Sequence, residues 1–283
     1  MVDWAEKNRD HFNNSASTYN SKFSKTILQI IEEIQVRRDW IGIDWIDEED
    51  ESNSLNNVRL LDYACGTGLV SRALAPYITS ATGIDISSSM VHEYNTSASN
   101  QGIPESEMHA VVGNLIDSSS LPDSSFEGKE FFDFDVAAVG MGWHHFTDPA
   151  YAAKALGKRL KKGGVLLIID FLPHEGIGEG GHGHGHAHHH GHSGNHNHNH
   201  SHDAGDQGEK ERADGYGEDK NMESAAAHTV THWGFAKEDI KKMYEEAGVG
   251  VDFDFVVLGK GVVFEKEGKS MRRTAFMAKG RKA

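Results

Sequence analysis

Residues 58–76 constrain the fold of this chain more than any other stretch. An apolar run ends at Asp62, a Gly-x-Gly turn follows at Gly66 and Gly68, and an apolar pattern with helical spacing begins at Leu69. This order predicts a buried strand, a tight loop and the start of a helix, a unit in which a nucleotide-like ligand lies close to the backbone. The acid at the mouth of the loop indicates that this ligand carries positive charge there.

Strand-like and helix-like patterns alternate after this loop. The predicted strands cover 58–63, 80–85, 109–113, 133–139, 164–170, 251–258 and 271–279. The helical patterns between and after them cover 67–76, 87–100, 149–161 and 236–247. Such alternation predicts an α/β fold, with a mostly parallel seven-stranded sheet and helices on both faces.

Three regions follow from the composition along the chain. Residues 1–57 are predicted to form an N-terminal helical cap, which ends in an acidic linker. The α/β domain is expected to occupy 58–173 and 228–283. Residues 174–227 are rich in Gly, His, Asn and Asp, so we expect a long disordered insertion after the fifth strand, because it has too few apolar residues to offset its ordering entropy.

The charge and cysteine content exclude some classes of function. The net charge is −15 with His neutral, which argues against nucleic-acid binding because no basic excess is available to displace counterions. The single cysteine, Cys65, excludes an intramolecular disulfide framework. No run of 18 apolar residues is present, so no membrane span is predicted, and we expect a cytoplasmic or nuclear protein.

Polar residues end the next two predicted strands. Asp85 follows Gly68 by 17 residues, and an acid at the carboxyl end of such a strand can accept both ribose hydroxyls. Helix capping is the alternative role for Asp85. Asn114 ends the third strand, where an amide can bond the edge of adenine through both its oxygen and its NH2 group.

These segments, in this order and spacing, resemble the class I S-adenosylmethionine-dependent methyltransferases. The resemblance is to the ubiquinone/menaquinone C-methyltransferase-like (methyltransferase type 11/25) family, and it covers 58–173 well and 228–283 loosely. It implies a Rossmann-like fold and S-adenosylmethionine as the cofactor. Residues 11–19 also look like the N-terminal helix that forms a lid over the cofactor in that family.

The resemblance also implies individual contacts to the cofactor. It places Asp62 near the methionine ammonium and Asp85 at the ribose, and it makes Tyr19 a candidate lid residue. The remaining implied contacts are backbone at Ala64, Gly66, Gly68, Val139 and Gly140, and adenine contacts from Ile86, Met90, Asn114 and Leu115.

Three histidines are candidates for acid–base catalysis. His144 and His145 follow the fourth strand, where an acceptor should approach, and His232 lies where the fold resumes after the insertion. An imidazole with a pKa of about 6.5 suits a general base, although packing in the protein is the alternative role for each ring. No metal ligand set is expected at this site. Nearby aromatic residues predict an apolar rim for the acceptor: Trp143, Phe146, Trp233 and Phe235.

The insertion contains a histidine run. Residues 182–202 hold 11 of the 19 histidines, mostly as His-Gly-His and His-Asn-His. The run predicts weak binding of divalent metals such as Zn, Ni or Cu. An inert low-complexity loop, pH-dependent partner binding and methylation of the run itself remain alternatives.

The sequence favours an enzyme that methylates a small molecule without a metal ion. The alternative is a protein methyltransferase or a cofactor-binding regulatory subunit that docks a protein partner. An NAD oxidoreductase is disfavoured because Ser71 replaces the third glycine of the dinucleotide fingerprint.

Overall fold

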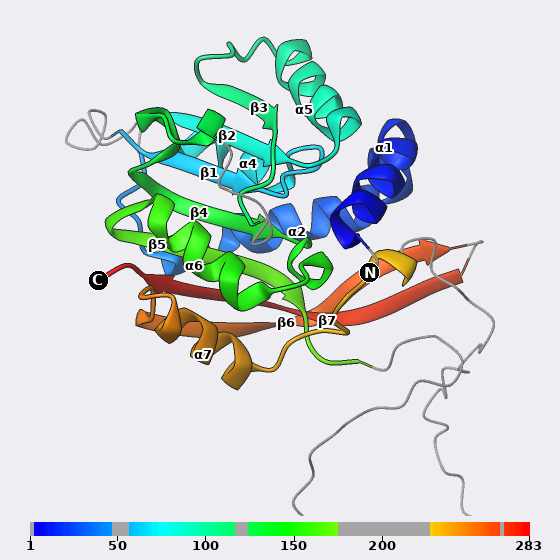
Figure 1. The fold of residues 1–283 in the computed structure, drawn as a ribbon. Coiled ribbons are helices and arrows are strands. Elements are labelled where there is room, and N and C mark those ends of the chain that lie inside the picture. Colours follow the sequence, from blue (N-terminus) through cyan, green and yellow to red (C-terminus); the bar gives the residue numbers. More distant parts are fainter. Residues whose placement is uncertain (1–2, 47–56, 117–123, 175–226, 267–268) are drawn as a thin grey trace, which may run out of the picture. The chain divides into compact units, whose positions relative to one another are not determined.

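A computed structural model describes residues 3–46, 57–116, 124–174, 227–266 and 269–283, and the fold below is that of the unit formed by 1–175 and 228–283. These residues form a seven-stranded sheet in the order β3-β2-β1-β4-β5-β7-β6 (Figure 1). The strands are β1 (Arg59–Tyr63), β2 (Ser80–Asp85), β3 (Met108–Val112), β4 (Phe134–Gly140), β5 (Leu160–Phe171), β6 (Val251–Lys266) and β7 (Lys269–Arg281). The first five are parallel, and β7 runs antiparallel to both β5 and β6. The predicted α/β class with a mostly parallel sheet is confirmed.

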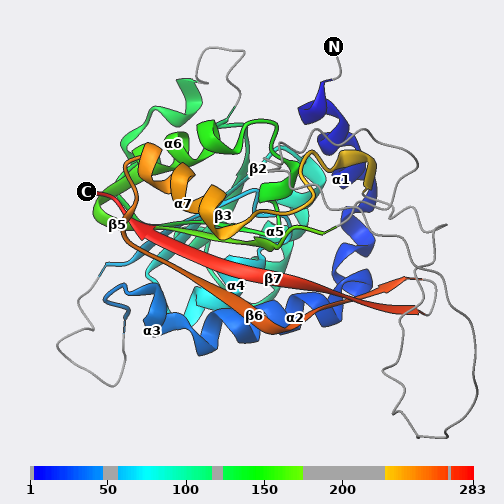
Figure 2. The same ribbon diagram turned by 90° about the horizontal axis from the view of Figure 1, so that it is seen from below.

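Helices cover both faces of this sheet. Helices α2 (Ser24–Val36), α4 (Leu69–Leu74) and α5 (Ser88–Asn100) pack on one face, and α6 (Pro149–Arg159) and α7 (Lys237–Glu246) pack on the other. Figure 2 shows α6 and α7 on the opposite side of the sheet from α2. In β1, Leu60 enters the first core and Leu61 the second, and both are fully buried. This explains why the strand is apolar without alternation.

Capping residues set the helix starts near the carboxyl edge of the sheet. The Ser87 hydroxyl accepts a hydrogen bond from the Met90 N–H and caps α5, so capping is done by Ser87 rather than Asp85. Asp148 caps α6 by accepting from the Tyr151 N–H, and Pro149 occupies the first turn.

The final two strands are longer than the sequence predicts. They continue as a hairpin beyond β5, with Val262 opposite Arg273. Helix α2 supports the hairpin, since the Gln29 amide donates to the Gly261 carbonyl and accepts from the Val263 N–H. These side-chain bonds satisfy outer-edge backbone groups that would otherwise need a further strand.

The N-terminal region is helical as predicted, with α1 (Trp4–Lys22) and α3 (Arg38–Ile41) on either side of α2. Most of the acidic linker predicted at 44–57, and all of the insertion predicted at 174–227 except its two end residues, lie outside the described residues, including the histidine run. The domain bounds drawn from the sequence therefore stay predictions. Among the described helices, none has the length and apolarity needed to cross a membrane.

Candidate functional site

Two loops at the carboxyl edge of the sheet contain backbone in the left-handed region. Ala64 after β1 has φ +53° and Met141 after β4 has φ +61°, values that non-glycine residues seldom adopt. The loops lie against each other, since a Cβ added at Gly142 would be 3.1 Å from the Ala64 Cβ. Val139 and Gly140, two of the predicted cofactor contacts, end β4 beside them. Backbone strain of this kind is concentrated at ligand sites.

The two glycines of the loop after β1 differ in their surroundings. Gly68 has φ +87°, and a Cβ there would lie 2.9 Å from the Tyr94 ring, so packing requires glycine. Gly66 has φ +51°, yet no atom lies within 4 Å of an added Cβ. The space beside Gly66 is therefore open, as the approach of a ligand to the backbone requires.

Asp85, the predicted ribose ligand, ends β2 and is 8% exposed. Its Oδ2 accepts from the Gly66 N–H and its Oδ1 accepts from the Ser87 N–H, both at 2.8 Å. Burial raises the pKa of this carboxyl, and the backbone bonds oppose that shift. Further lone pairs remain on both oxygens for hydroxyl donors. Ile86 follows on the same loop, and Met90 is buried in the first turn of α5.

Asn114, the predicted adenine contact, lies just after β3. Its Oδ1 accepts from the Tyr63 hydroxyl and from the Ile116 N–H, both at 3.1 Å. The Leu115 N–H in turn donates to the Tyr63 hydroxyl at 3.2 Å. The oxygen is thus already engaged, and the NH2 group, with no partner among the described residues, is the part of Asn114 left for an adenine nitrogen.

Asp62 lies beneath the loop and is 1% exposed. Its Oδ2 accepts from the Ser71 N–H at 3.0 Å and from the Ser71 hydroxyl at 2.7 Å, and the Tyr94 hydroxyl donates to Ser71. Burial raises the pKa of Asp62 to about 7, and the Asp85 charge adds to the shift. The carboxyl is therefore directed at the start of α4, and its contact with an ammonium group stays a prediction.

Helix α1 is hydrogen-bonded to both loops at this edge. The Asn13 side-chain oxygen accepts from the Ser87 hydroxyl at 2.8 Å and from the Ser89 N–H at 3.1 Å. The Thr67 hydroxyl donates to the Asn20 side-chain oxygen at 2.7 Å. These bonds place α1 over the loops that hold Gly66 and Asp85, which is the position expected of a lid.

Aromatic side chains of α1 line the same side. The Phe12 ring packs edge-on to His145, with centroids 5.3 Å apart. The Tyr19 ring lies 6.5 Å from that of Phe12, measured between centroids. Burial, and to a lesser degree the charge of the Asp85 carboxylate, raise the pKa of Tyr19 to about 12. The Tyr19 phenol is thus neutral beside the predicted ribose site.

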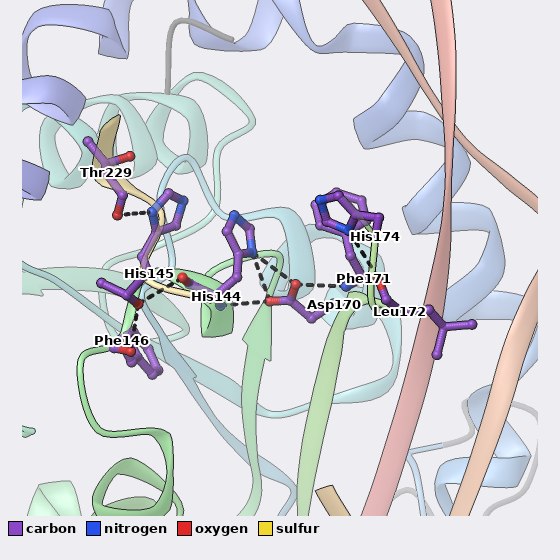
Figure 3. Close-up of polar contacts among 9 residues, drawn as sticks. His144, His145, Phe146, Asp170, Phe171, Leu172, His174 and Thr229 are labelled. Carbon is purple, nitrogen blue, oxygen red and sulfur yellow. Dashed lines mark hydrogen bonds and ion pairs between the residues drawn. The ribbon is translucent and has the colours of Figure 1, made fainter. Parts of the chain in front are cut away.

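A histidine and a buried acid meet beyond β4 and β5. His144 Nδ1 lies 2.9 Å and 3.0 Å from the two carboxylate oxygens of Asp170, and the His144 backbone N–H donates to Oδ2 at 3.1 Å (Figure 3). Asp170 is the last residue but one of β5 and is fully buried, and the Phe171 N–H also donates to it at 2.7 Å. A carboxylate accepts only, so Nδ1 carries the hydrogen and Nε2 of neutral His144 is the basic atom.

His145 is held differently from its neighbour. Its ring lies 4.2 Å from that of His144, and its Nδ1 is 3.0 Å from the Thr229 carbonyl (Figure 3). Burial, and then the His144 ring, lower the pKa of His145 well below its usual value. His145 is therefore neutral at pH 7, with Nδ1 donating to the carbonyl.

The third candidate, His232, reaches the site through its backbone. Its N–H donates to the His144 carbonyl at 3.1 Å, whereas its ring packs against Phe235 with centroids 5.3 Å apart. Burial lowers the pKa of His232, and its Nε2 is buried without a partner among the described residues. The expected aromatic rim is wrong for three of its four members: Trp143, Phe146 and Phe235 are buried in the core beneath α6 and α7.

Four polar residues at this site were not among the predicted ones. Asp170 had a detectable signal, because parallel pairing of β4 with β5 brings the end of β5 beside the loop after β4. Asn13, Asn20 and Thr67 gave none, since polar residues on an amphipathic helix and in a loop are ordinary. Within the described parts of the chain, no group of three or more His, Cys, Asp or Glu side chains is arranged to hold a metal.

The donors and acceptors at this edge fit an adenosyl cofactor with a cationic amino-acid end. Open space lies beside Gly66, Asp85 offers acceptors to hydroxyls, Asn114 offers an NH2 group, and Asp62 is an acid with a raised pKa that a cation would lower.

Comparisons with known proteins agree with this arrangement. A sequence model of the family described as "Methyltransferase domain" matches residues 22–249. The chain is 30% identical over 193 residues to an uncharacterized methyltransferase of Schizosaccharomyces pombe, covering 61% of this chain and 66% of that protein. It is 28% identical over 117 residues to a ubiquinone biosynthesis O-methyltransferase of Idiomarina loihiensis, covering 41% of this chain and 43% of that protein. The matches thus span less than two thirds of each relative.

The fold is similar to that of a solved structure along its whole length. Magnesium protoporphyrin IX methyltransferase from Synechocystis PCC 6803, with bound SAM, superposes with a TM-score of 0.55 at 12% identity, covering 99% of this chain and 98% of that one. At this identity the likeness establishes the fold alone.

Proposed function

This chain belongs to the methyltransferase domain family. On that premise we propose that it is a class I S-adenosylmethionine-dependent enzyme that methylates a small-molecule acceptor without a metal ion. The observation that carries the proposal is the contact of His144 with the buried Asp170 beside the predicted cofactor loops. When bound, S-adenosylmethionine supplies an electrophilic methyl group on an already activated leaving group.

His144 acts as the general base for an oxygen or nitrogen acceptor. Its Nε2 takes the acceptor proton as the acceptor atom attacks from about 3 Å, the usual attack distance. The Asp170 carboxylate fixes the tautomer through Nδ1 and stabilises the imidazolium that forms. A positioned base of this kind contributes about 10²–10⁴ in rate.

The cover formed by α1 favours a small acceptor over a protein segment. Its bonds to Ser87 and Thr67, together with Phe12 against His145, keep this helix over the site. A folded partner would have to displace those contacts. Metal independence is supported by Asp170, whose two oxygens are already occupied by N–H donors of His144 and Phe171.

Labelled S-adenosylmethionine, added to the protein with cell extract, tests the proposal. We expect label in a low-molecular-weight product, undiminished by a chelator such as EDTA. Label in protein alone would favour a protein methyltransferase, and no label despite calorimetric binding of S-adenosylmethionine would favour a cofactor-binding regulatory role. Loss of transfer in EDTA, restored by a divalent metal, would contradict metal independence.

A further inference from the structure

A partly buried arginine on β7, Arg273, lies beside the Phe171 ring, and no acidic partner for it is found among the described residues. The Arg273 guanidinium carbon is 5.6 Å from the centroid of the Phe171 ring. Within the part of the chain that the structure describes, Arg273 makes no ion pair or side-chain hydrogen bond. Burial lowers its pKa, and no carboxylate opposes that shift. Removing a charged guanidinium from water is unfavourable unless an anion or other acceptor compensates for it.

The same ring connects this arginine to the proposed base. Phe171 lies 5.5 Å from the His144 ring and 5.8 Å from the His174 ring, measured between centroids. Figure 3 shows Phe171 and His174 next to the His144–Asp170 contact. The Arg273 guanidinium and the ring of the proposed base therefore both lie within 6 Å of the Phe171 ring centroid.

His174 does not neutralise the arginine. Its Nδ1 lies 3.0 Å from the Leu172 carbonyl and donates to it, which leaves Nε2 as a buried acceptor without a partner among the described residues. Burial, and to a lesser degree the Arg273 charge, lower the His174 pKa, so the ring is neutral at pH 7. His174 therefore adds no charge beside the Arg273 guanidinium.

We propose that Arg273 binds a carboxylate on the methyl acceptor, so that the acceptor of this enzyme is an organic acid. The inference rests on the proposed function and deepens it by giving the substrate class. A guanidinium and a carboxylate form two parallel N–H···O bonds. A monoanion matches the single charge of Arg273, whereas a phosphate dianion would leave excess negative charge close to Asp170.

Binding of simple probes tests the site without knowledge of the acceptor. Benzoate, benzamide and phenyl phosphate are titrated calorimetrically into protein saturated with S-adenosylhomocysteine. We expect benzoate to bind at least about tenfold more tightly than neutral, similarly shaped benzamide, as a charge-assisted pair requires. Equal affinity for the two, or tighter binding of phenyl phosphate, would overturn the proposal.

Two neighbouring arginines give a matched pair of variants. Arg273→Gln should abolish the preference for benzoate, whereas Arg272→Gln should keep it, because Arg272 is exposed and its guanidinium donates to the Lys260 carbonyl. Arg273→Lys should retain a reduced preference, since lysine keeps the charge and loses the paired geometry. A benzoate preference that persists in folded Arg273→Gln, checked by its melting temperature, would refute the assignment.

Turnover separates this inference from the proposed function. With the natural acceptor from extract, Arg273→Gln should raise KM at least about tenfold with little change in kcat, and the acceptor should be retained on an anion exchanger. If the acceptor is uncharged and Arg273→Gln leaves its KM unchanged, the inference about Arg273 is wrong, whereas the proposed methyltransferase function is unaffected. If Arg273→Gln loses benzoate binding but the unchanged protein methylates no small molecule, the carboxylate site is supported and the proposed function is wrong.

Discussion

Replacing Asp170 by Asn tests whether this acid acts through His144. The variant keeps the size of the side chain but removes the charge that faces Nδ1 at 2.9 Å and 3.0 Å and two backbone N–H donors. Asn has one acceptor oxygen, and its NH2 group is placed against those N–H donors. Each charge-assisted bond is worth about 1.5–3 kcal/mol, so we expect the free energy of unfolding to fall by about 2–4 kcal/mol.

The effect on catalysis follows from the role of the base. A base worth about 10²–10⁴ in rate lowers the barrier by about 3–5 kcal/mol. Without the carboxylate, the Nδ1–H tautomer and the imidazolium both lose their stabilisation, and we expect kcat to fall at least about 100-fold. The affinity for S-adenosylmethionine should change by no more than about twofold, because the predicted cofactor contacts lie on other loops.

A double-mutant cycle provides the assay. His144→Gln, Asp170→Asn and the double variant are compared by single-turnover methyl transfer at temperatures well below their melting points. If Asp170 works only through His144, the double variant is no slower than His144→Gln by more than about threefold. Losses that multiply would refute the reasoning. Asp148→Asn is the control: it removes one negative charge from the N-cap of α6, four residues after His144, and should leave kcat unchanged.

Five other substitutions, which make up three predictions, test the predicted cofactor site. Burial raises the pKa of Asp62 to about 7, so an ammonium group that binds beside it should lower this pKa and release a fraction of a proton near pH 7. Calorimetry of cofactor binding in buffers of different ionisation enthalpy measures this release. Asp62→Asn should abolish it, and an unchanged release would place the ammonium elsewhere. Gly66→Ala should weaken cofactor binding at least about tenfold, because the added Cβ projects into the open space predicted for the cofactor. It should also lower the free energy of unfolding by about 1–2 kcal/mol, because alanine is disfavoured at φ +51°. Gly68→Ala should mainly lower the melting temperature, because its Cβ would strike a tyrosine ring at 2.9 Å; the opposite ranking of the two variants would contradict the assignment of that space. Asn13→Ala and Asn20→Ala should each increase hydrogen exchange in α1, since each loses a bond to a cofactor loop, and unchanged exchange would show that packing alone holds the helix.

The sheet was predictable because its signals are local. The central parallel strands β1 and β4 are largely apolar and buried on both faces, as Leu60 and Leu61 illustrate, and each leads into a glycine-containing turn. The hairpin beyond Leu258 was missed because its extension depends on Gln29 of α2, more than 200 residues away in the sequence.

The sequence also located the loops of the predicted cofactor site more clearly than it located the residues around the acceptor. Gly66 and Asp85 follow two strands that are neighbours in the sequence, and the Gly66 N–H donates directly to Asp85 at 2.8 Å. The aromatic rim failed because the spacing of Trp143 and Phe146 does not say which face of the sheet they enter. Position along a loop gives proximity to a strand end, but the direction of a side chain depends on packing against α6 and α7.

The acceptor side is joined across the insertion, which explains how two very different compositions coexist in one chain. The His174 N–H donates to the Trp233 carbonyl at 3.0 Å, the Phe235 N–H donates to the Phe171 carbonyl at 2.9 Å, and the Thr231 N–H donates to the His144 carbonyl at 3.0 Å. The chain therefore leaves β5 and returns to it at a closed, hydrogen-bonded point. The entropic cost of closing a loop rises only slowly with the number of residues in it, by about 0.6 kcal/mol for each doubling. Residues between these bonds can thus change in number and composition with little effect on stability, while the surroundings of His144 are kept by the bonds themselves.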